Sequence, residues 1–276
     1  MKVRKLLQSI FPKVAVNIRD GIYVILASFD RLFGRKTPVF VLSYHSIASD
    51  SWRFSVSKTA FSKQIAYLSK HYDFITLATL ERYLKGKVKL DKPSVVLTFD
   101  DGYADIVSLK PLFKKYGIKP ALFVLSNTKK PNWKELATKR PFLTKAQIRS
   151  LHKLGWEINV HSATHANLAT LSEKDLHTEI AKAKKDIEET LGAITPYFAY
   201  PRGKYNNAVL TKVKNTKYRM ALTMDDGAVT PGVAMLQIPR IGVDGTHSLE
   251  IFKTLFSPSA ITFRKLVKES PIGRYL

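Results

Sequence analysis

Short apolar runs alternate with longer helix-forming stretches from Val39 onward, and this alternation restricts the fold more than any other feature. The runs are rich in β-branched and aromatic residues, which favour strands. They cover residues 39–45, 73–77, 94–99, 121–125, 157–161, 197–200, 218–223 and 236–243. Strands that alternate with helices predict parallel βα units, and seven or eight such units predict an α/β fold. We expect a single distorted (β/α) barrel of about seven strands.

The stretches between the runs carry helix start and stop signals. Thr144 with Gln147 is a capping-box pattern, and the segment from 172 to 191 is followed by Gly192. The sequence contains no linker rich in Pro, Gly or Ser and no internal repeat. Its 276 residues are enough for one barrel-sized domain with a full core.

Two carboxylates follow the third strand-like run directly. The sequence from 96 to 103 ends in Asp100, Asp101, Gly102 and Tyr103. A glycine at this point lets the chain turn, so that neighbouring carboxylates can take different roles in one pocket. The alternative is an ordinary Asp-Asp-Gly turn.

Two histidines stand at the end of another run, 156–160, as His161 and His165. They can converge on one metal if the backbone there is helical or tightly turned, although the spacing also arises by chance. The carboxyl ends of parallel strands are where barrel enzymes build their sites. The joint pattern therefore favours a metal centre with Asp, His and His ligands and one position open for water.

The composition limits the chemistry further. The absence of cysteine excludes thiolate ligands, thiol nucleophiles and disulfides, so a bound metal has to be held by histidine and carboxylate.

The formal net charge is +23, from 45 Lys and Arg against 22 Asp and Glu. Between 110 and 145 the only acid is Glu135 among many lysines. Such a segment suits an anionic polymer, a nucleic acid or the surface of an anionic membrane, or it is simply a solvated lysine surface. No nucleic-acid-binding signature accompanies it, so nucleic acid is not the expected partner, and no obligate protein partner is evident.

Residues 1–38 are predicted to be a basic N-terminal extension, and 39–276 the catalytic domain. The longest apolar stretch of the extension, 21–29, is too short to span a bilayer and does not resemble a cleavable signal peptide. A peripheral membrane helix and a helix packed on the domain are the two alternatives.

Four ordered motifs resemble the polysaccharide deacetylases, the NodB-homology domains of carbohydrate esterase family four. Residues 98–102 (Thr-Phe-Asp-Asp-Gly) and 161–165 (His-Ser-Ala-Thr-His) look like the first two motifs of that family. Residues 198–206 are similar to its third motif. Residues 41–47 resemble the Tyr-His strand of the subgroup that deacetylates poly-N-acetylglucosamine. The resemblance extends over 39–256.

By this resemblance, Asp101, His161 and His165 hold one divalent metal ion, with zinc expected and cobalt or nickel as alternatives. Asp100 would be the general base. The substrate would be an acetylated polysaccharide or oligosaccharide, and the expected location is the bacterial cell envelope or a membrane-associated position.

The resemblance places the general acid less directly. Much of the family has a histidine near the end of the fold, but residues 238–243 contain none. In the poly-N-acetylglucosamine subgroup the histidine of the first strand takes this place, so His45 is the candidate and His247 the fallback.

The third motif departs from the family pattern. Ala199 stands where the family has an arginine that tunes the base, and Arg240 could supply that charge from the last strand. Tyr200, Pro201 and Arg202 would contact the substrate, and the family would have the amide of residue 202 face the oxyanion.

The resemblance implies a metal-dependent polysaccharide N-deacetylase that acts on N-acetylhexosamine units of an envelope glycan or exopolysaccharide. An O-acetyl or xylan-type esterase on the same fold is one alternative. A non-catalytic glycan-binding module is another.

Overall fold

A computed structural model describes residues 18–30 and 38–269. The chain divides into two compact units, one formed by Thr37–Thr246 and the other by the stretches on either side of it. The predicted boundary between an extension, 1–38, and a catalytic domain, 39–276, stays a prediction. Part of that extension lies outside the described residues. In the described part of the chain, no helix is both long enough and apolar enough to cross a bilayer.

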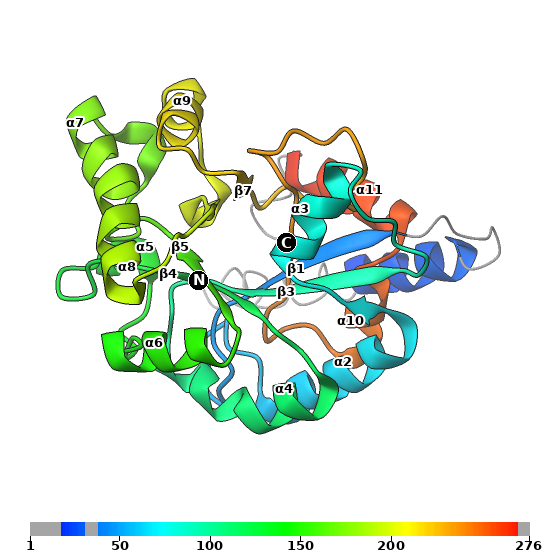
Figure 1. Cartoon of the computed structure of the whole chain (residues 1–276). Coiled ribbons are helices and arrows are strands. Elements are labelled where there is room, and N and C mark those ends of the chain that lie inside the picture. The colour runs from blue at the N-terminus through cyan, green and yellow to red at the C-terminus, as the bar shows by residue number, and fades with distance from the viewer. Residues whose placement is uncertain (1–17, 31–37, 270–276) are drawn as a thin grey trace, which may run out of the picture. The chain divides into compact units, whose positions relative to one another are not determined.

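The unit Thr37–Thr246 is built on one parallel sheet (Figure 1). Its strand order is β7-β6-β5-β4-β3-β1-β8, with β2 beside the start of β3. The strands are β1 (Val39–Tyr44), β2 (Asp73–Phe74), β3 (Ser94–Phe99), β4 (Ala121–Val124), β5 (Glu157–Val160), β6 (Tyr197–Ala199), β7 (Met220–Leu222) and β8 (Ile241–Gly242). Each strand lies within one of the predicted runs, and the predicted distorted (β/α) barrel is confirmed.

Helices connect successive strands in this unit. They are α2 (Lys58–His71), α3 (Leu77–Leu84), α4 (Lys110–Tyr116), α5 (Trp133–Leu136), α6 (Lys145–Lys153), α7 (Glu173–Leu176), α8 (Ala183–Leu191) and α9 (Asn207–Asn215). The predicted capping box at the start of α6 is present, since the Thr144 side chain accepts from the Gln147 amide and the Gln147 side chain accepts from the Thr144 amide. Gly192 ends α8 with a left-handed φ of 67°.

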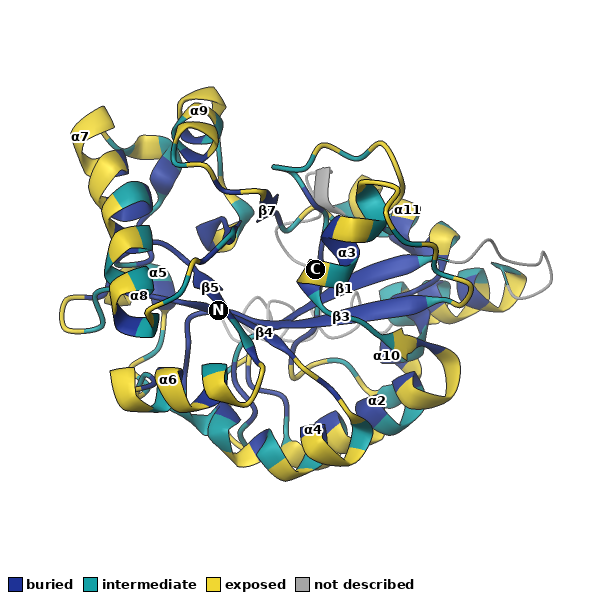
Figure 2. Cartoon of the chain, viewed as in Figure 1, coloured by how far each residue is buried: buried dark blue, intermediate teal, exposed yellow. Residues whose placement is uncertain are grey.

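Strands β1, β3, β4, β6 and β7 are buried along their whole length, as expected of a parallel sheet covered by helices (Figure 2). Alternate residues of a strand face opposite sides, so Val39, Val41 and Val96 contribute to the cluster inside the barrel. The intervening Tyr44 and Phe99 pack against aromatic rings of the outer helices. Continued past the end of β3, this alternation makes residue 100 an inward position.

Helix α3 closes the end of the barrel where the strands begin. Leu77 and Leu80 belong to the interior cluster. The Glu157 carboxylate, at the start of β5, accepts hydrogen bonds from the amides of Leu77 at 2.7 Å and Ala78 at 2.9 Å. The first amides of a helix lack intrahelical partners, so this carboxylate satisfies two of them and fixes the helix to the sheet.

The prediction of one continuous strand over 236–243 is wrong. Only Ile241–Gly242 form a strand, on β1, whereas Ile238 forms a parallel bridge with β7. Pro239 lies between them and has no amide to donate to a strand ladder. The segment therefore passes from β7, at one edge of the sheet, to the outer side of β1, where it forms β8 at the other edge. Arg240 is carried on this crossing and is fully buried.

The other unit is helical in its described part. It contains a helix at residues 18–30 and helices α10 (Leu249–Thr254) and α11 (Pro258–Glu269). Asp30 accepts hydrogen bonds from the Ser259 amide at 3.0 Å and the Ser259 hydroxyl at 2.7 Å, which ties the first helix to the start of α11. Tyr23 packs edge-on against Phe263.

Candidate metal centre and active site

The carboxyl ends of β1, β3 and β5 bring the predicted site residues together. The in-register pairing of β1 with β3 puts His45 beside the position of Asp100, and Asp100 is followed by Asp101. Strand β4 separates β3 from β5, whose end continues into His161 and His165. Residues far apart in the sequence thus meet because parallel strands end at the same edge.

Asp101, His161 and His165 form a compact set of potential metal ligands. One ligand atom from each residue lies within 4.8 Å of the others, and all three residues are buried. Both histidine Nε2 atoms approach Oδ1 of Asp101, at 3.6 Å for His161 and 3.4 Å for His165. Tetrahedral bonds of about 2.0–2.2 Å put neighbouring ligand atoms roughly 3.3–3.6 Å apart. The two distances to Asp101 are therefore those expected between ligands of a zinc-sized ion.

Hydrogen bonding leaves the right atoms free for an ion. The Nδ1 of His161 lies 2.8 Å from the carbonyl oxygen of Ala199, so this nitrogen carries the proton and Nε2 presents its lone pair. Oδ1 of Asp101 is buried and accepts no hydrogen bond among the described residues. A buried carboxylate oxygen without a donor is costly, and a cation at this point would offset that cost.

Burial adjusts the proton affinities of these ligands. It lowers the pKa of His161 to about 3 and that of His165 to about 4, so both rings are neutral at physiological pH. Burial also raises the pKa of Asp101 to about 6. Metal ligands have to be deprotonated, and a bound cation would favour the ionised Asp101.

The backbone of the site is strained at two of the candidate ligands and at Ser162. Asp101 (φ 66°), Ser162 (φ 72°) and His165 (φ 65°) are non-glycine residues with left-handed φ. The two histidines thus converge through a tight turn, closed by the hydrogen bond from the His165 amide to the Ser162 hydroxyl at 2.9 Å. At Gly102 (φ 75°), an added Cβ would come within 2.9 Å of Val124.

Asp100 forms a bidentate ion pair with Arg240. The two guanidinium nitrogens Nη1 and Nη2 donate to its two carboxylate oxygens at 2.7 and 2.8 Å, and both residues are buried. The Nε of Arg240 donates to the Thr223 carbonyl at 3.0 Å, and the Ser43 hydroxyl donates to Asp100 at 3.3 Å. Burial alone would raise the pKa of Asp100, but the guanidinium outweighs it and holds that pKa well below its usual range.

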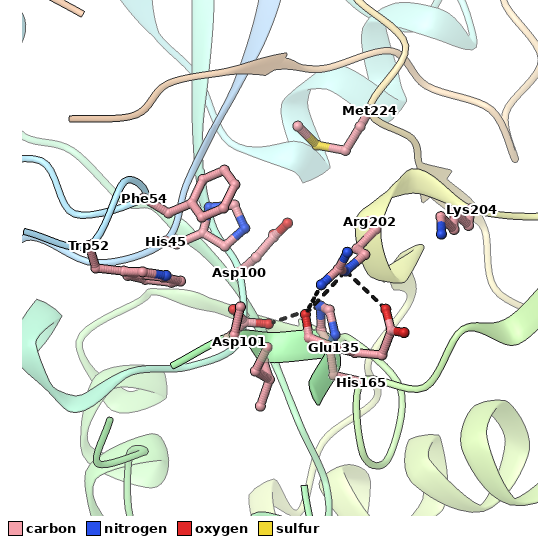
Figure 3. A pocket seen from close by; sticks show the side chains of 12 residues that line it. His45, Trp52, Phe54, Asp100, Asp101, Glu135, His165, Arg202, Lys204 and Met224 are labelled. Atoms are coloured by element: carbon pink, nitrogen blue, oxygen red, sulfur yellow. Dashed lines mark hydrogen bonds and ion pairs between the residues drawn. The ribbon is translucent and has the colours of Figure 1, made fainter. Parts of the chain in front are cut away.

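A pocket opens over these carboxylates (Figure 3). Its lining comes from several loops at this end of the sheet: His45, Trp52, Phe54, Asp100, Asp101, Glu135, Leu136, Ala137, His165, Arg202, Lys204 and Met224. The His45 ring is half-buried, lies 5.1 Å from the Phe54 ring, and its Nδ1 has no hydrogen-bond partner among the described residues. His247, the other candidate for the general acid, belongs to the other unit.

The segment from Tyr200 to Arg202 forms a turn beside the pocket. The Tyr200 hydroxyl donates to the Leu236 carbonyl at 3.0 Å, and Pro201 is buried. Arg202 has a left-handed φ of 54°, and its side chain reaches across to α5. Its Nε lies 3.0 Å from the Glu135 carboxylate and 3.1 Å from the Glu135 carbonyl oxygen. This pair joins two loops of the pocket wall; the predicted substrate contacts of the segment stay predictions.

Several lining residues belong to no motif and were not predicted. Trp52 and Phe54 follow β1, Glu135 and Leu136 follow β4, and Met224 follows β7. The one signal that points to them is their place after a predicted strand, because loops at the carboxyl ends of strands surround the site in a barrel.

Comparison with known proteins gives a consistent result. Residues 87–221 match the model of the polysaccharide deacetylase family. The YxkH protein of Bacillus subtilis, whose name assigns it to the polysaccharide deacetylases, is 29% identical over 205 residues, covering 74% of this chain and 70% of that protein. The poly-beta-1,6-N-acetyl-D-glucosamine N-deacetylase of Staphylococcus aureus (strain MRSA252) is 27% identical over 274 residues, covering 87% of this chain and 93% of that enzyme.

Two solved structures share the fold. The deacetylase PplD of Streptococcus pyogenes, in complex with acetate, superposes with a TM-score of 0.70 at 24% identity, covering 81% of this chain and 100% of that chain. IcaB from Ammonifex degensii superposes with a TM-score of 0.69 at 22% identity, covering 82% and 98% of the two chains.

Replacing either histidine should abolish tight metal binding. We expect His161→Ala and His165→Ala each to weaken zinc binding at least ~100-fold, because loss of a ligand exceeds the effect of losing a supporting hydrogen bond. Calorimetric titration of chelator-treated protein with zinc measures this. His177→Ala, at an exposed position outside the site, is the control. Full zinc affinity in both ligand variants would contradict the assignment.

Removing the guanidinium beside Asp100 should destabilise the fold. Arg240→Met leaves a buried carboxylate unpaired, and we expect the free energy of unfolding of metal-free protein to fall by ~3–5 kcal/mol. Denaturant unfolding measures the change. The double variant Arg240→Met/Asp100→Leu removes both charges and should recover most of the loss. If the double variant is as unstable as the single one, packing rather than charge explains the effect.

Proposed function

Because the chain belongs to the polysaccharide deacetylase family, we propose that it is a metal-dependent N-deacetylase. The reaction is hydrolysis of the acetamide of N-acetylhexosamine units in a cell-envelope glycan or exopolysaccharide. One divalent ion, zinc, is the proposed cofactor, and Asp101, His161 and His165 are its ligands.

One observation carries this proposal: a second buried carboxylate, held ionised, lies directly beside a three-ligand set. Asp100 is fixed by Arg240 in a bidentate pair, and Asp101 presents an oxygen with no donor. A module that only bound glycans would gain nothing from such a costly arrangement of buried charges. Two adjacent carboxylates with opposite pKa shifts are typical of sites where each has a separate chemical role.

When bound, the metal ion would polarise the acetyl carbonyl and make water a better nucleophile at neutral pH. Asp100 would accept the proton of the attacking water. Its two oxygens are oriented by Arg240, and the ion pair keeps the carboxylate ionised before each turnover. In this proposal Arg240 tunes the base from the crossing segment, and the ion pair with Asp100 supports that role.

His45 is the proposed general acid. Its ring lines the same pocket as Asp100 and Asp101, and Nδ1 is free of protein partners among the described residues. An amine is a poor leaving group until it is protonated, so an acid within hydrogen-bond reach of the leaving nitrogen is required. The amide of Arg202, supported by the Tyr200–Pro201 turn, is the proposed donor to the oxyanion.

The substrate class follows from the relatives and from the pocket wall. One relative is named as a poly-beta-1,6-N-acetyl-D-glucosamine N-deacetylase, which supports an N-acetylglucosamine polymer here. Trp52 and Phe54 add aromatic faces to the pocket, and such faces pack well against sugar rings. We place the enzyme at the bacterial cell envelope, where glycans of this kind occur.

Mass spectrometry of N-acetylglucosamine oligomers tests the function directly. Zinc-loaded protein should release acetate and leave oligomers lighter by one acetyl group per turnover. Asp100→Asn should retain zinc and lose turnover by at least ~100-fold, since a general base contributes about that much. Hydrolysis of O-acetylated xylan in place of the amide substrate would contradict N-deacetylation. Near-normal turnover in Asp100→Asn would show that this residue is not the base.

The role of His45 predicts a substrate-selective defect. His45→Ala should reduce deacetylation of an N-acetyl sugar by at least ~100-fold. Hydrolysis of an aryl acetate should fall far less, because its leaving group needs no proton. The ratio of the two rates in each variant is the measurement. Equal losses on both substrates would point to a damaged fold or metal site, and no loss on either would assign the acid to another group.

A further inference from the structure

Three outer helices, α2, α4 and α6, stand side by side on the barrel wall (Figure 1). They follow β1, β3 and β4, which are consecutive in the sheet. Phe113 of α4 packs against Phe61 of α2 at 6.0 Å and against Trp156, just after α6, at 5.2 Å between ring centroids. Their outer faces are exposed (Figure 2).

The three helices of this wall carry cations, and another, Lys119, lies in the loop after α4. None of the three helices contains Asp or Glu. The cations, here called the basic wall, are Lys58, Lys63, Lys70, Lys110, Lys114, Lys115, Lys119, Lys145, Arg149 and Lys153. Within the described ranges, 18–30 and 38–269, none of them forms an ion pair. By contrast, α8 of the same unit pairs Lys185 with Glu189 at 3.7 Å.

Helix stability accounts for only part of the basic wall, because Lys70, Lys114, Lys115 and Lys153 lie in the last turns of their helices, where the helix dipole favours a cation. Lys58, Lys110 and Lys145 are the first residues of α2, α4 and α6, where the helix dipole is positive and favours an acid. The charges are unfavourable there and also repel one another across neighbouring helices. Their arrangement therefore points to an external anionic partner.

The basic wall also offers residues suited to a lipid interface. Leu154, at the end of α6, is 54% exposed. Tyr67 of α2 and Tyr116 of α4 are half-buried near the same ends of their helices, and Lys115 lies over the Tyr116 ring. Tyrosine and long lysine stems place apolar atoms at a boundary while their polar ends stay in water.

We propose that the basic wall binds peripherally to the surface of a membrane rich in anionic lipid. Packed helices lie about 8–10 Å apart, so cations on three of them cover an area rather than a line. An area of charge matches a lipid surface, whereas a single polymer strand is better held by a groove. The electrostatic attraction between a lysine and anionic lipid acts within a Debye length. Each lysine that faces the lipid adds to the binding free energy.

Vesicle sedimentation tests this proposal with charge-matched variants. The wall variant Lys63→Glu/Lys114→Glu/Arg149→Glu changes one exposed cation on each helix. The control Lys129→Glu/Lys174→Glu/Lys214→Glu changes the net charge equally at exposed positions elsewhere in the unit. With phosphatidylcholine vesicles containing phosphatidylglycerol, the wall variant should partition at least ~100-fold more weakly than the unmodified protein, and the control less than ~5-fold.

Further measurements on the same proteins decide the outcome. Unmodified protein should not bind pure phosphatidylcholine vesicles, and the wall variant should keep its zinc binding and unfolding midpoint, which excludes misfolding. Equal losses in both triple variants would overturn the proposal in favour of overall charge. A selective loss of polyphosphate binding, with vesicle binding unchanged, would assign the basic wall to an anionic polymer instead. Failure of the unmodified protein to bind anionic vesicles would also overturn it.

Discussion

The buried pair of Asp100 and Arg240 joins the closure of the barrel to the chemistry of its site. Arg240 lies on the segment that passes from β7 to β1, and its guanidinium reaches the carboxylate at the end of β3. The contact that holds this segment inside the barrel also sets the proton affinity of the proposed base. Fold and reactivity at this point are therefore not independent, since a shift of the segment would alter the charge beside Asp100.

Much of the sheet was predictable because local patterns and tertiary packing agree. A parallel strand covered on both faces reads as a continuous apolar run, and β1 to β7 each lie within such a run. The convergence of Asp101, His161 and His165 was predictable from their places after those runs, because parallel strands end at one edge. The capping box at Thr144 was predictable from two residues alone.

Other features depend on contacts that no short pattern encodes. The apolar residues of the crossing segment predict one strand. In the structure its first part pairs with β7 and its last part with β1, and Pro239 interrupts the ladder between them. The Arg202–Glu135 pair joins loops far apart in sequence, and the left-handed turn at His165 is imposed by its surroundings. The sequence predicted only part of the basic wall. Its lysine-rich segment, 110–145, includes α4 and the start of α6, whereas α2 lies earlier in the chain and joins the wall because β1 pairs with β3.

The hydrogen bond between His161 and the Ala199 carbonyl makes the orientation of a proposed metal ligand depend on the main chain. Any residue at position 199 offers the same oxygen, so the proton on Nδ1 and the lone pair on Nε2 do not depend on which side chain follows. The side chain of residue 199 takes no part in orienting His161, so an alanine at this position leaves that hydrogen bond intact. The side chain at position 199 is therefore restricted by packing in the interior cluster, where Ala199 is fully buried, and not by the orientation of His161.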